Sequence, residues 1–343
     1  MVLNNDRLYM ALDSLATASD EGIGTQAEVD SGPDKSESTH VRLWEICSDF
    51  HQLQNRMVDS ALPEHSDELR DIARRLIELC DTRFDQVLGE LFLSEQSNYN
   101  FTKPLYIAAS LIELIRRYDL YQGSPAYDDE QYHLMIMAAL AFNLGLLSYE
   151  RQIYESQEEF SFDEKRQLRE HYPQKSGDIL KAAGLDQVLI QDVVRNHNVA
   201  SENPSNDALM MRTPFIYAGI AMPQKRPVIQ QSIDNPSREF ARMFTQKELD
   251  AVYGGLYLKI NGLAPIGAIL NYQNFEKAMV VKGPANDDVA ASTVRILTNR
   301  SGVQLRKPGE RYSFTQTPSP LKGLADHHQF AWTRFSPHVM WQK

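Results

Sequence analysis

His197 has the sequence setting closest to that of a catalytic or metal-ligating residue. It follows Ile190 and Val194 on the apolar stripe of a predicted helix. A metal-dependent hydrolase needs several imidazole and carboxylate ligands, because the metal must activate water and hold phosphoryl oxygens. No such companions accompany His197 in the sequence, so we interpret it as a hydrogen-bonded core histidine.

Four basic residues could line a groove for a phosphate-containing ligand, since the guanidinium fork of arginine matches phosphate oxygens. They are Lys175, Arg195, Lys225 and Arg226. The alternative is that all four are ordinary surface charges, and the sequence leaves both interpretations open. It contains no glycine-rich phosphate loop and no inferable Ser-His-Asp arrangement.

The composition is that of a soluble globular protein. The 343 residues include 42% hydrophobic and 24% charged side chains. No apolar run approaches the roughly 18 residues that span a membrane, and residues 1–20 lack a secretory signal pattern. Cys47 and Cys80 have neither disulfide nor zinc spacing, so we expect buried free thiols. We predict a cytoplasmic protein.

The charge is unevenly distributed along the chain. The net charge is −11, but residues 289–343 contain eight Lys or Arg and two Asp or Glu, which gives +6 and leaves −17 for the rest. The acidic body argues against nucleic-acid binding. The basic end could bind phosphate or an acidic partner, or it could simply be solvated.

The first 97 residues are predicted to comprise an N-terminal segment with a linker, followed by a helical unit. Residues 1–40 combine a short amphipathic segment with a mobile linker over 16–40, which is rich in Ser, Asp, Glu and Gly. An N-terminal helical unit follows over 41–97. One of its helices should begin at Ser66, because a cap residue precedes two acids there.

Residues 98–262 should form a helical core. Its most distinctive segment, 134–147, is apolar almost all round, which indicates a central buried helix. Another helix should start at the capping box Ser161–Glu164 and end before Pro173. Further helices are expected at 104–120, from beyond Gly184 to His197, at 208–222, and from the capping box Thr245–Glu248 to Leu258.

After residue 262 the pattern changes to short strands. The runs 268–270, 278–281 and 294–297 are apolar and separated by Gly, Asn and Pro. Residues 263–343 should therefore form a small antiparallel β appendage, with a proline-containing basic tail over the last 40 residues. His338, in this tail, is expected to be solvated. The predicted fold class is mainly α: an HD-type helical bundle with a helical unit before it and the β appendage after it.

The order of elements over residues 98–300, together with five short segments, resembles the HD-GYP family of metal-dependent cyclic di-GMP phosphodiesterases. The segments are 103–108, 138–145, 172–180, 194–199 and 258–267. The family's His-Asp motif usually reads Leu-His-Asp-Ile-Gly-Lys, and its glycine is present here as Gly145. The Gly-Tyr-Pro signature is absent.

The resemblance places other residue types at almost every metal-ligand position. Lys103 occupies the position of a histidine in the family, Phe142 and Asn143 replace the His-Asp pair, and Tyr172 occupies the position of a further histidine. His197 is kept, but Asn198 replaces the histidine after it. His171 is one residue from a ligand position, which on a helix rotates its side chain by about 100°.

A bacterial-type, degenerate HD-GYP-like protein without metal or other cofactor is therefore expected. It is expected to be a pseudoenzyme that regulates or scaffolds a signalling pathway. Its partner would be another signalling protein or a second copy, and neither nucleic acid nor membrane. One alternative is a cyclic di-GMP receptor without turnover that uses the four basic residues. Another is a phosphodiesterase with a rearranged metal site that recruits His171 and His197.

Overall fold

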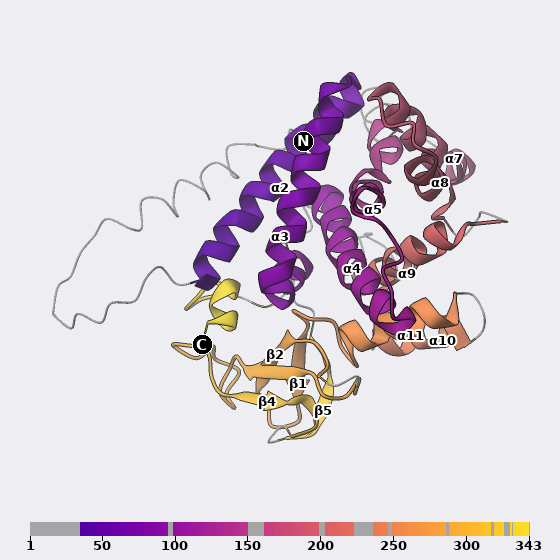
Figure 1. Ribbon diagram of the computed structural model, residues 1–343. Helices are drawn as coiled ribbons and strands as arrows, with labels where there is room; N and C mark the ends of the chain where they lie inside the picture. Colours follow the sequence, from indigo (N-terminus) through magenta and orange to yellow (C-terminus); the bar gives the residue numbers. More distant parts are fainter. Residues whose placement is uncertain are drawn as a thin grey trace, which may run out of the picture. The chain divides into compact units, whose positions relative to one another are not determined.

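A computed structural model describes residues 35–94, 99–149, 161–198, 203–222, 236–245, 249–285, 288–316, 319–325, 330 and 332–342. The chain divides into two compact units, Met1–Asp34 and Lys35–Lys343, and every described element belongs to the second (Figure 1). Most of the predicted linker over 16–40 lies outside the described residues. The finer domain boundaries expected at 41, 98 and 263 stay predictions.

Two long helices, α2 (Lys35–Asp59) and α3 (Glu64–Leu93), pack against each other at the start of the described chain. The predicted apolar stripe of α3, from Leu69 to Leu79, is buried. The predicted start at Ser66 is wrong, because α3 begins two residues earlier, directly after Pro63. The proline's φ of −55° already fits a helix, and the Ser66 hydroxyl donates instead to the Pro63 carbonyl.

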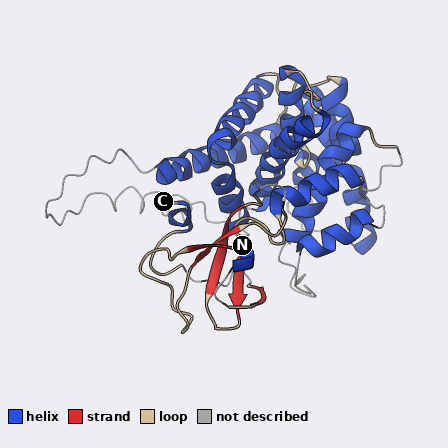
Figure 2. Cartoon of the chain, turned by 60° about the horizontal axis from the view of Figure 1, so that its bottom comes forward, coloured by secondary structure: helices blue, strands red, loops and turns tan. Residues whose placement is uncertain are grey.

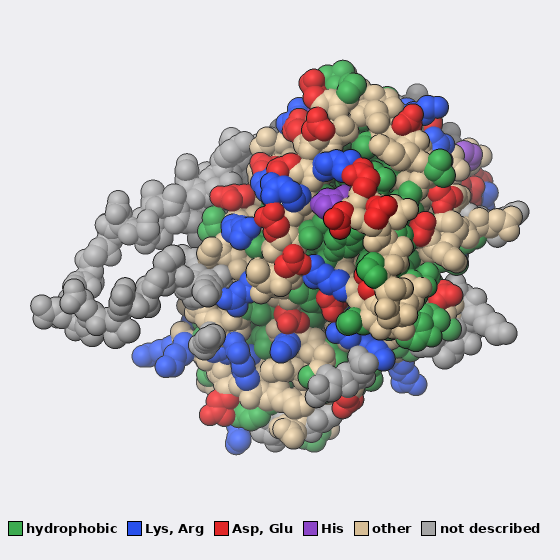
Figure 3. All heavy atoms as spheres, viewed as in Figure 1, with side chains coloured by type: hydrophobic (Ala, Val, Ile, Leu, Met, Phe, Trp, Pro, Cys, Tyr) green, Lys and Arg blue, Asp and Glu red, His purple; other side chains and the backbone are tan. Residues whose placement is uncertain are grey.

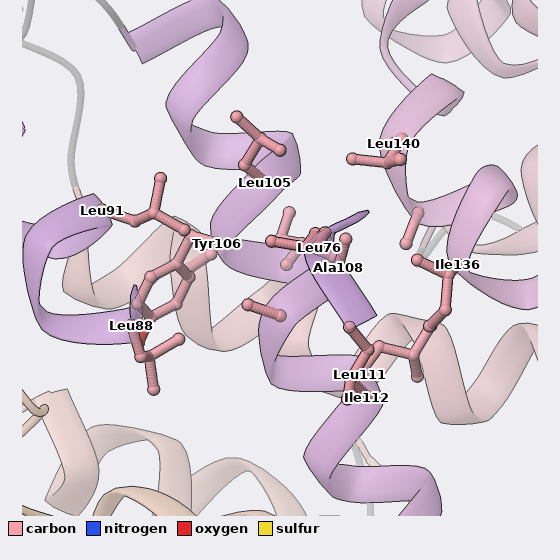
Figure 4. Packing of buried hydrophobic residues seen from close by; sticks show 14 of the residues in the cluster. Leu76, Leu88, Leu91, Leu105, Tyr106, Ala108, Leu111, Ile112, Ile136 and Leu140 are labelled. Carbon is pink, nitrogen blue, oxygen red and sulfur yellow. The ribbon is translucent and has the colours of Figure 1, made fainter. Parts of the chain in front are cut away.

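The centre of the core lies where α3, α4 (Tyr99–Gln122) and α5 (Asp129–Ala141) meet (Figure 4). Every residue of α5 from Leu134 to Ala141 is buried, as its all-round apolar pattern predicts. The side chains that fill the space between the three helices include Leu76, Leu88, Leu91, Leu105, Tyr106, Ala108, Leu111, Ile112, Ile136 and Leu140.

The central helix is interrupted, contrary to the prediction of one helix over 134–147. A turn at 142–143 separates α5 from a second helical stretch that begins at Leu144. The prediction that a helix ends before Pro173 is also wrong, since α7 (Phe162–Ala182) runs through this proline. The proline costs a backbone hydrogen bond there, and the buried neighbours Tyr172 and Ser176 pack the helix in place.

Gly184 ends α7 with a φ of 81°, a conformation that favours glycine. The chain then forms α8 (Val188–Asn196) and α9 (Asn206–Ala221), close to the predicted ranges. The predicted capping box Thr245–Glu248 is wrong. Thr245 ends a helix that the sequence did not reveal, α10 (Pro236–Thr245), and α11 (Ala251–Asn261) begins at Asp250, whose carboxylate accepts from Val252 and Tyr253 N–H.

The C-terminal part forms the five-stranded antiparallel sheet β4-β3-β2-β1-β5 (Figure 2). The three predicted runs become β1 (Ile269–Tyr272), β2 (Lys277–Lys282) and β3 (Thr293–Ile296). The tail is not plain loop, because it supplies β4 (Arg311–Ser313) and β5 (Leu321–Leu324), with the 3-10 turn Phe314–Gln316 between them. The predicted class, mainly α with a small antiparallel β appendage, is confirmed.

The C-terminal 3-10 helix η4 (Pro337–Trp341) attaches the sheet to α2 and α3. Trp341 donates its indole N–H to the Val281 carbonyl at 2.8 Å, and its ring lies where a Cβ on Gly89 would be. The expectation of a solvated His338 is wrong. Its ring stacks on that of His40, with 4.6 Å between centroids.

One stretch, Asp129–Tyr149, is long and apolar enough to cross a membrane by length and composition alone. However, 72% of its most apolar 18-residue window is buried inside the protein, as is common for the core helix of a soluble protein. Cys47 and Cys80 are free and buried, as expected. Burial raises the pKa of both thiols, which makes them poor nucleophiles.

Candidate functional site

The turn that interrupts the helix after α5 is stabilised by a serine of α7. The Ser176 hydroxyl donates to the Phe142 carbonyl at 2.7 Å and accepts from the Gly145 N–H at 2.8 Å. Gly145 allows the two segments to approach closely, because a Cβ at this position would lie 2.2 Å from the Tyr172 carbonyl oxygen. The break therefore seats α7 so that Tyr172 lies near Phe142.

His197 caps the C-terminus of α8 and is fully buried. Its Nδ1 lies 2.8 Å from the Val194 carbonyl oxygen, which can only accept, so Nδ1 carries the proton. Its Nε2 then accepts from the Tyr172 hydroxyl at 2.9 Å. Burial lowers the pKa of His197 to about 4. The imidazole is therefore neutral at pH 7, with both nitrogens hydrogen-bonded.

Aromatic rings surround this imidazole. The centroid of His197 lies 5.2 Å from that of Phe142, 5.8 Å from that of Tyr172 and 4.8 Å from that of Phe215 on α9. Phe142 and Phe215 also contact each other edge to face, at 5.4 Å. Three positions that the resemblance to the HD-GYP family assigns to metal ligands thus meet in space, and aromatic side chains fill the space between them.

Lys103 lies beside this cluster. Its ammonium is 5.6 Å from the centre of the Phe215 ring, within the range of a cation–π interaction. Burial lowers the pKa of Lys103 to about 8. Its charge is also among the lesser causes that lower the pKa of His197.

Asn143 and Asn198 each make a hydrogen bond to a residue outside the aromatic cluster. The Asn143 side-chain oxygen accepts from Gln54 of α2 at 3.1 Å, and both residues are buried. Asn198 supplies its backbone carbonyl to Arg212, at 2.6 Å. Asn143 therefore ties the break after α5 to the N-terminal helices rather than to His197.

Arg212 is a site residue that sequence reasoning missed. This buried arginine of α9 donates to the carbonyls of Asn196, His197 and Asn198, at 3.0, 3.2 and 2.6 Å. It thereby satisfies carbonyls at the C-terminus of α8, and burial lowers the pKa of its guanidinium. A charged residue inside the apolar pattern of 208–222 was the signal that could have identified it.

The four basic residues expected to line a phosphate groove are only partly described. Lys225 and Arg226 lie outside the described residues, and Lys175 is half-buried on α7. Arg195 donates to Asp178 at 2.8 Å and to Gln191 at 3.1 Å, while its guanidinium covers Gly177. Its charge is therefore matched on the surface formed by α7 and α8.

The donor set does not fit a binuclear metal centre. The described part of the chain holds no group of three or more His, Cys, Asp or Glu side chains that could bind a metal ion. His171 is exposed, and its Nδ1 contacts the Gln167 carbonyl within α7, whereas His197 is buried. The two imidazoles therefore do not form a common site.

The neutral state of His197 predicts a pH-dependent stability. Its pKa is about 4 in the folded chain and 6.5 ordinarily, so the unfolded chain binds more protons between these values. The free energy of unfolding should therefore fall as the pH drops from 6.5 to 4, by up to about 3 kcal/mol. Urea unfolding at pH steps across this window measures the effect.

The matched variant is His197→Gln, whose amide keeps one donor and one acceptor but does not titrate. This variant should be less stable at pH 7 and have a flatter profile between pH 6.5 and 4. An equally steep profile in the variant would show that other groups cause the loss.

Comparison of the chain with protein-family models, with curated proteins and with solved structures finds no match in any of the three. The resemblance to the HD-GYP family therefore depends on the sequence segments alone.

Proposed function

We propose that this chain is a cytoplasmic, non-catalytic signalling protein of HD-GYP-like type that acts through protein contacts. In this proposal the former hydrolase site has become part of the core. A regulator or scaffold needs the fold and its surfaces but not the metal. This function would therefore permit the loss of metal ligands while residues such as Gly145 and Pro173, which the resemblance shows as retained, stay in place.

The observation that carries the proposal is the convergence at His197. Phe142, Tyr172 and Lys103 come from three different segments, and the resemblance assigns each of them to a ligand position. All three lie at or beside the same buried imidazole. Because the phenyl and phenol rings pack against the imidazole edge to face or tilted, they take up space that metal ions and their water would need.

Elemental analysis of protein purified without a histidine tag tests the proposal directly. We expect far less than one iron, manganese or zinc ion per chain, and no hydrolysis of cyclic di-GMP when these metals are added. One or more tightly bound ions per chain would contradict it.

A triple variant tests the assignment of the positions themselves. Lys103→His, Phe142→His and Tyr172→His would place three imidazoles around His197, and nitrogen ligands suit zinc and other transition metals. We expect this variant to gain zinc or nickel affinity that wild type lacks. A matched variant with three histidines at exposed positions of α7 controls for nonspecific binding.

A cyclic dinucleotide receptor is the second candidate, and one observation favours it. Two cations, Lys103 and Arg212, lie near His197, and after burial the charge of each helps to lower the pKa of this imidazole. Cations in such a setting favour a phosphate-containing ligand electrostatically. Isothermal titration with cyclic di-GMP tests this function. Binding that Lys103→Met weakens would support it, whereas no heat at high ligand concentration would exclude it.

A further inference from the structure

The hairpin between β1 and β2 contains the most unusual backbone conformation among the non-glycine residues that the structure describes. Tyr272 N–H donates to the Glu276 carbonyl at 3.0 Å, and Phe275 N–H donates to the Tyr272 carbonyl at 3.1 Å. Phe275 closes this turn with a φ of 68°. Glycine adopts this left-handed conformation freely, but a bulky side chain is strained in it.

Phe275 makes little contribution to the packing of its own chain. Its side chain is 73% exposed, and the turn is held by its neighbours. Asn274 N–H donates to the Ser319 hydroxyl at 3.2 Å, and Glu276 N–H donates to the Asn274 side chain at 3.2 Å. A strained aromatic residue that is not needed for packing indicates a role in contact with another molecule.

Two other exposed apolar side chains lie at the same end of the sheet. Leu297 N–H donates to the Lys277 carbonyl, so the loop 299–303 leaves the sheet beside the β1–β2 turn. Arg300 of this loop is 3.8 Å from Glu276. Val303 is 46% exposed, and Leu321, at the start of β5, is 40% exposed. We call Phe275, Val303 and Leu321 the sheet tip.

The helical part carries a second exposed apolar surface, where α4 ends beside α11. Leu120 is 83% exposed and Tyr121 is 65% exposed. The ring of Tyr118 stacks on that of Tyr121. It also contacts the ring of Tyr253 edge to face, with 5.2 Å between the centroids of Tyr118 and Tyr253. Tyrosines are enriched at protein interfaces. We call Tyr121, Leu120 and the half-buried Tyr118 the tyrosine patch; Tyr253 is buried and packs against Tyr118.

The two surfaces differ in the charge that surrounds them. Residues 263–343 contain ten Lys or Arg and five Asp or Glu, a net charge of +5, which leaves −16 for residues 1–262. Exposed Arg300 and Lys322 lie near the sheet tip. Beside the tyrosine patch, the pKa of Tyr253 is raised by burial, then by Tyr118, and to a lesser extent by the nearby carboxylates of Asp250 and Asp207. Figure 3 shows acidic and basic side chains mixed on the helical surface, with several basic ones on one side of the lower part near the strands.

We propose that the sheet tip of one copy of this chain binds the tyrosine patch of a second copy. The contact joins apolar side chains at its centre and opposite charges at its rim. Because the two surfaces differ, a bound pair keeps one free tip, on one chain, and one free patch, on the other, so the contact is head to tail and can build species larger than a dimer. This interface is separate from the filled site around His197.

Sedimentation velocity of the full chain at increasing concentrations tests the proposal. We expect a mass that rises above the 39.1 kDa of one chain and a weaker association at high salt. A single 39.1 kDa species at every concentration would overturn it. Binding of a monomeric wild type to phosphatidylserine vesicles through Phe275 would also overturn it, in favour of a lipid surface.

Phe275→Gly separates binding from folding, because it removes the ring and relieves the strain together. We expect association to weaken about tenfold or more, as for a central aromatic contact, while the melting temperature stays equal or rises. Unchanged association would contradict the proposal. Val188→Ser is the control, since Val188 is 85% exposed on α8, away from both surfaces, and its loss should not change association.

Mixing two deficient variants tests the head-to-tail geometry. Phe275→Gly keeps its tyrosine patch, and Tyr121→Ser keeps its sheet tip. Each variant alone should be monomeric, but a mixture should form a complex of one copy of each and grow no further. Two monomers in the mixture, or self-association of either variant alone, would contradict the geometry.

Discussion

Gly145→Ala is expected to lower the free energy of unfolding by about 2–3 kcal/mol, the cost of overpacking a closed contact. The new Cβ would lie 2.2 Å from the Tyr172 carbonyl oxygen and 2.7 Å from the Ser176 backbone nitrogen. Both are main-chain atoms of α7, so the helix must move as a whole. Because Tyr172 also donates to His197, the displacement would reach the imidazole. Chemical denaturation at pH 7 measures the loss.

Gly255→Ala in α11 is the matched control. A Cβ there would meet no atom within 4 Å, and alanine is the better helix former by about 1 kcal/mol. This variant should be as stable as wild type or slightly more stable. A loss of similar size in both variants would mean that close approach of α7 is not what Gly145 provides.

Lys103→Met is expected to raise the free energy of unfolding at pH 7 by about 1–2 kcal/mol. Lys103 has a pKa of about 8 in the folded chain and 10.5 ordinarily, which corresponds to at most about 3 kcal/mol, and partial exposure reduces this value. Methionine keeps the aliphatic packing without the charge.

The sign of the pH dependence follows from the same values. Between pH 8 and 10.5 the unfolded chain binds more protons than the folded chain, so wild type gains stability as the pH rises through this window. The advantage of Lys103→Met should therefore be full below pH 8 and vanish toward pH 10.5.

Lys103→Arg is the control for this prediction, since its guanidinium stays charged and should give no such gain. Destabilisation by Lys103→Met at pH 7 would instead show that the ammonium stabilises the fold. The interactions of the ammonium would then contribute more free energy than its desolvation costs.

The local spacing of apolar residues was sufficient to predict the long helices. The apolar stripe of α3 and the all-round apolar sequence of α5 are repeated over several turns, so the burial of Leu69, Leu76 and Ile136 follows from spacing alone. Gly184 likewise marked a helix end through its backbone freedom. The three central strands were recognisable because each is a short apolar run between turn residues.

Elements that depend on distant partners were not predictable in this way. β4 and β5 contain few apolar residues and exist because β3 and β1 offer them unpaired backbone groups. α7 continues through Pro173 because packing around Tyr172 and Ser176 overrides the local cost of proline. Thr245 could equally have begun or ended a helix, and only the carboxylate of Asp250 shows where α11 starts.

By itself, the sequence determined the fold class and the residue types at the positions that the resemblance assigns to a metal site: one imidazole, two aromatic rings, an ammonium and two amides. The tertiary structure decided which of them meet. It brings Phe142, Tyr172 and His197 into one cluster, turns Asn143 toward Gln54 instead, and adds Phe215 and Arg212 from α9. The physical reason is that periodicity reports only which face of a helix is buried, whereas the neighbours of a buried side chain are set by how separate helices pack.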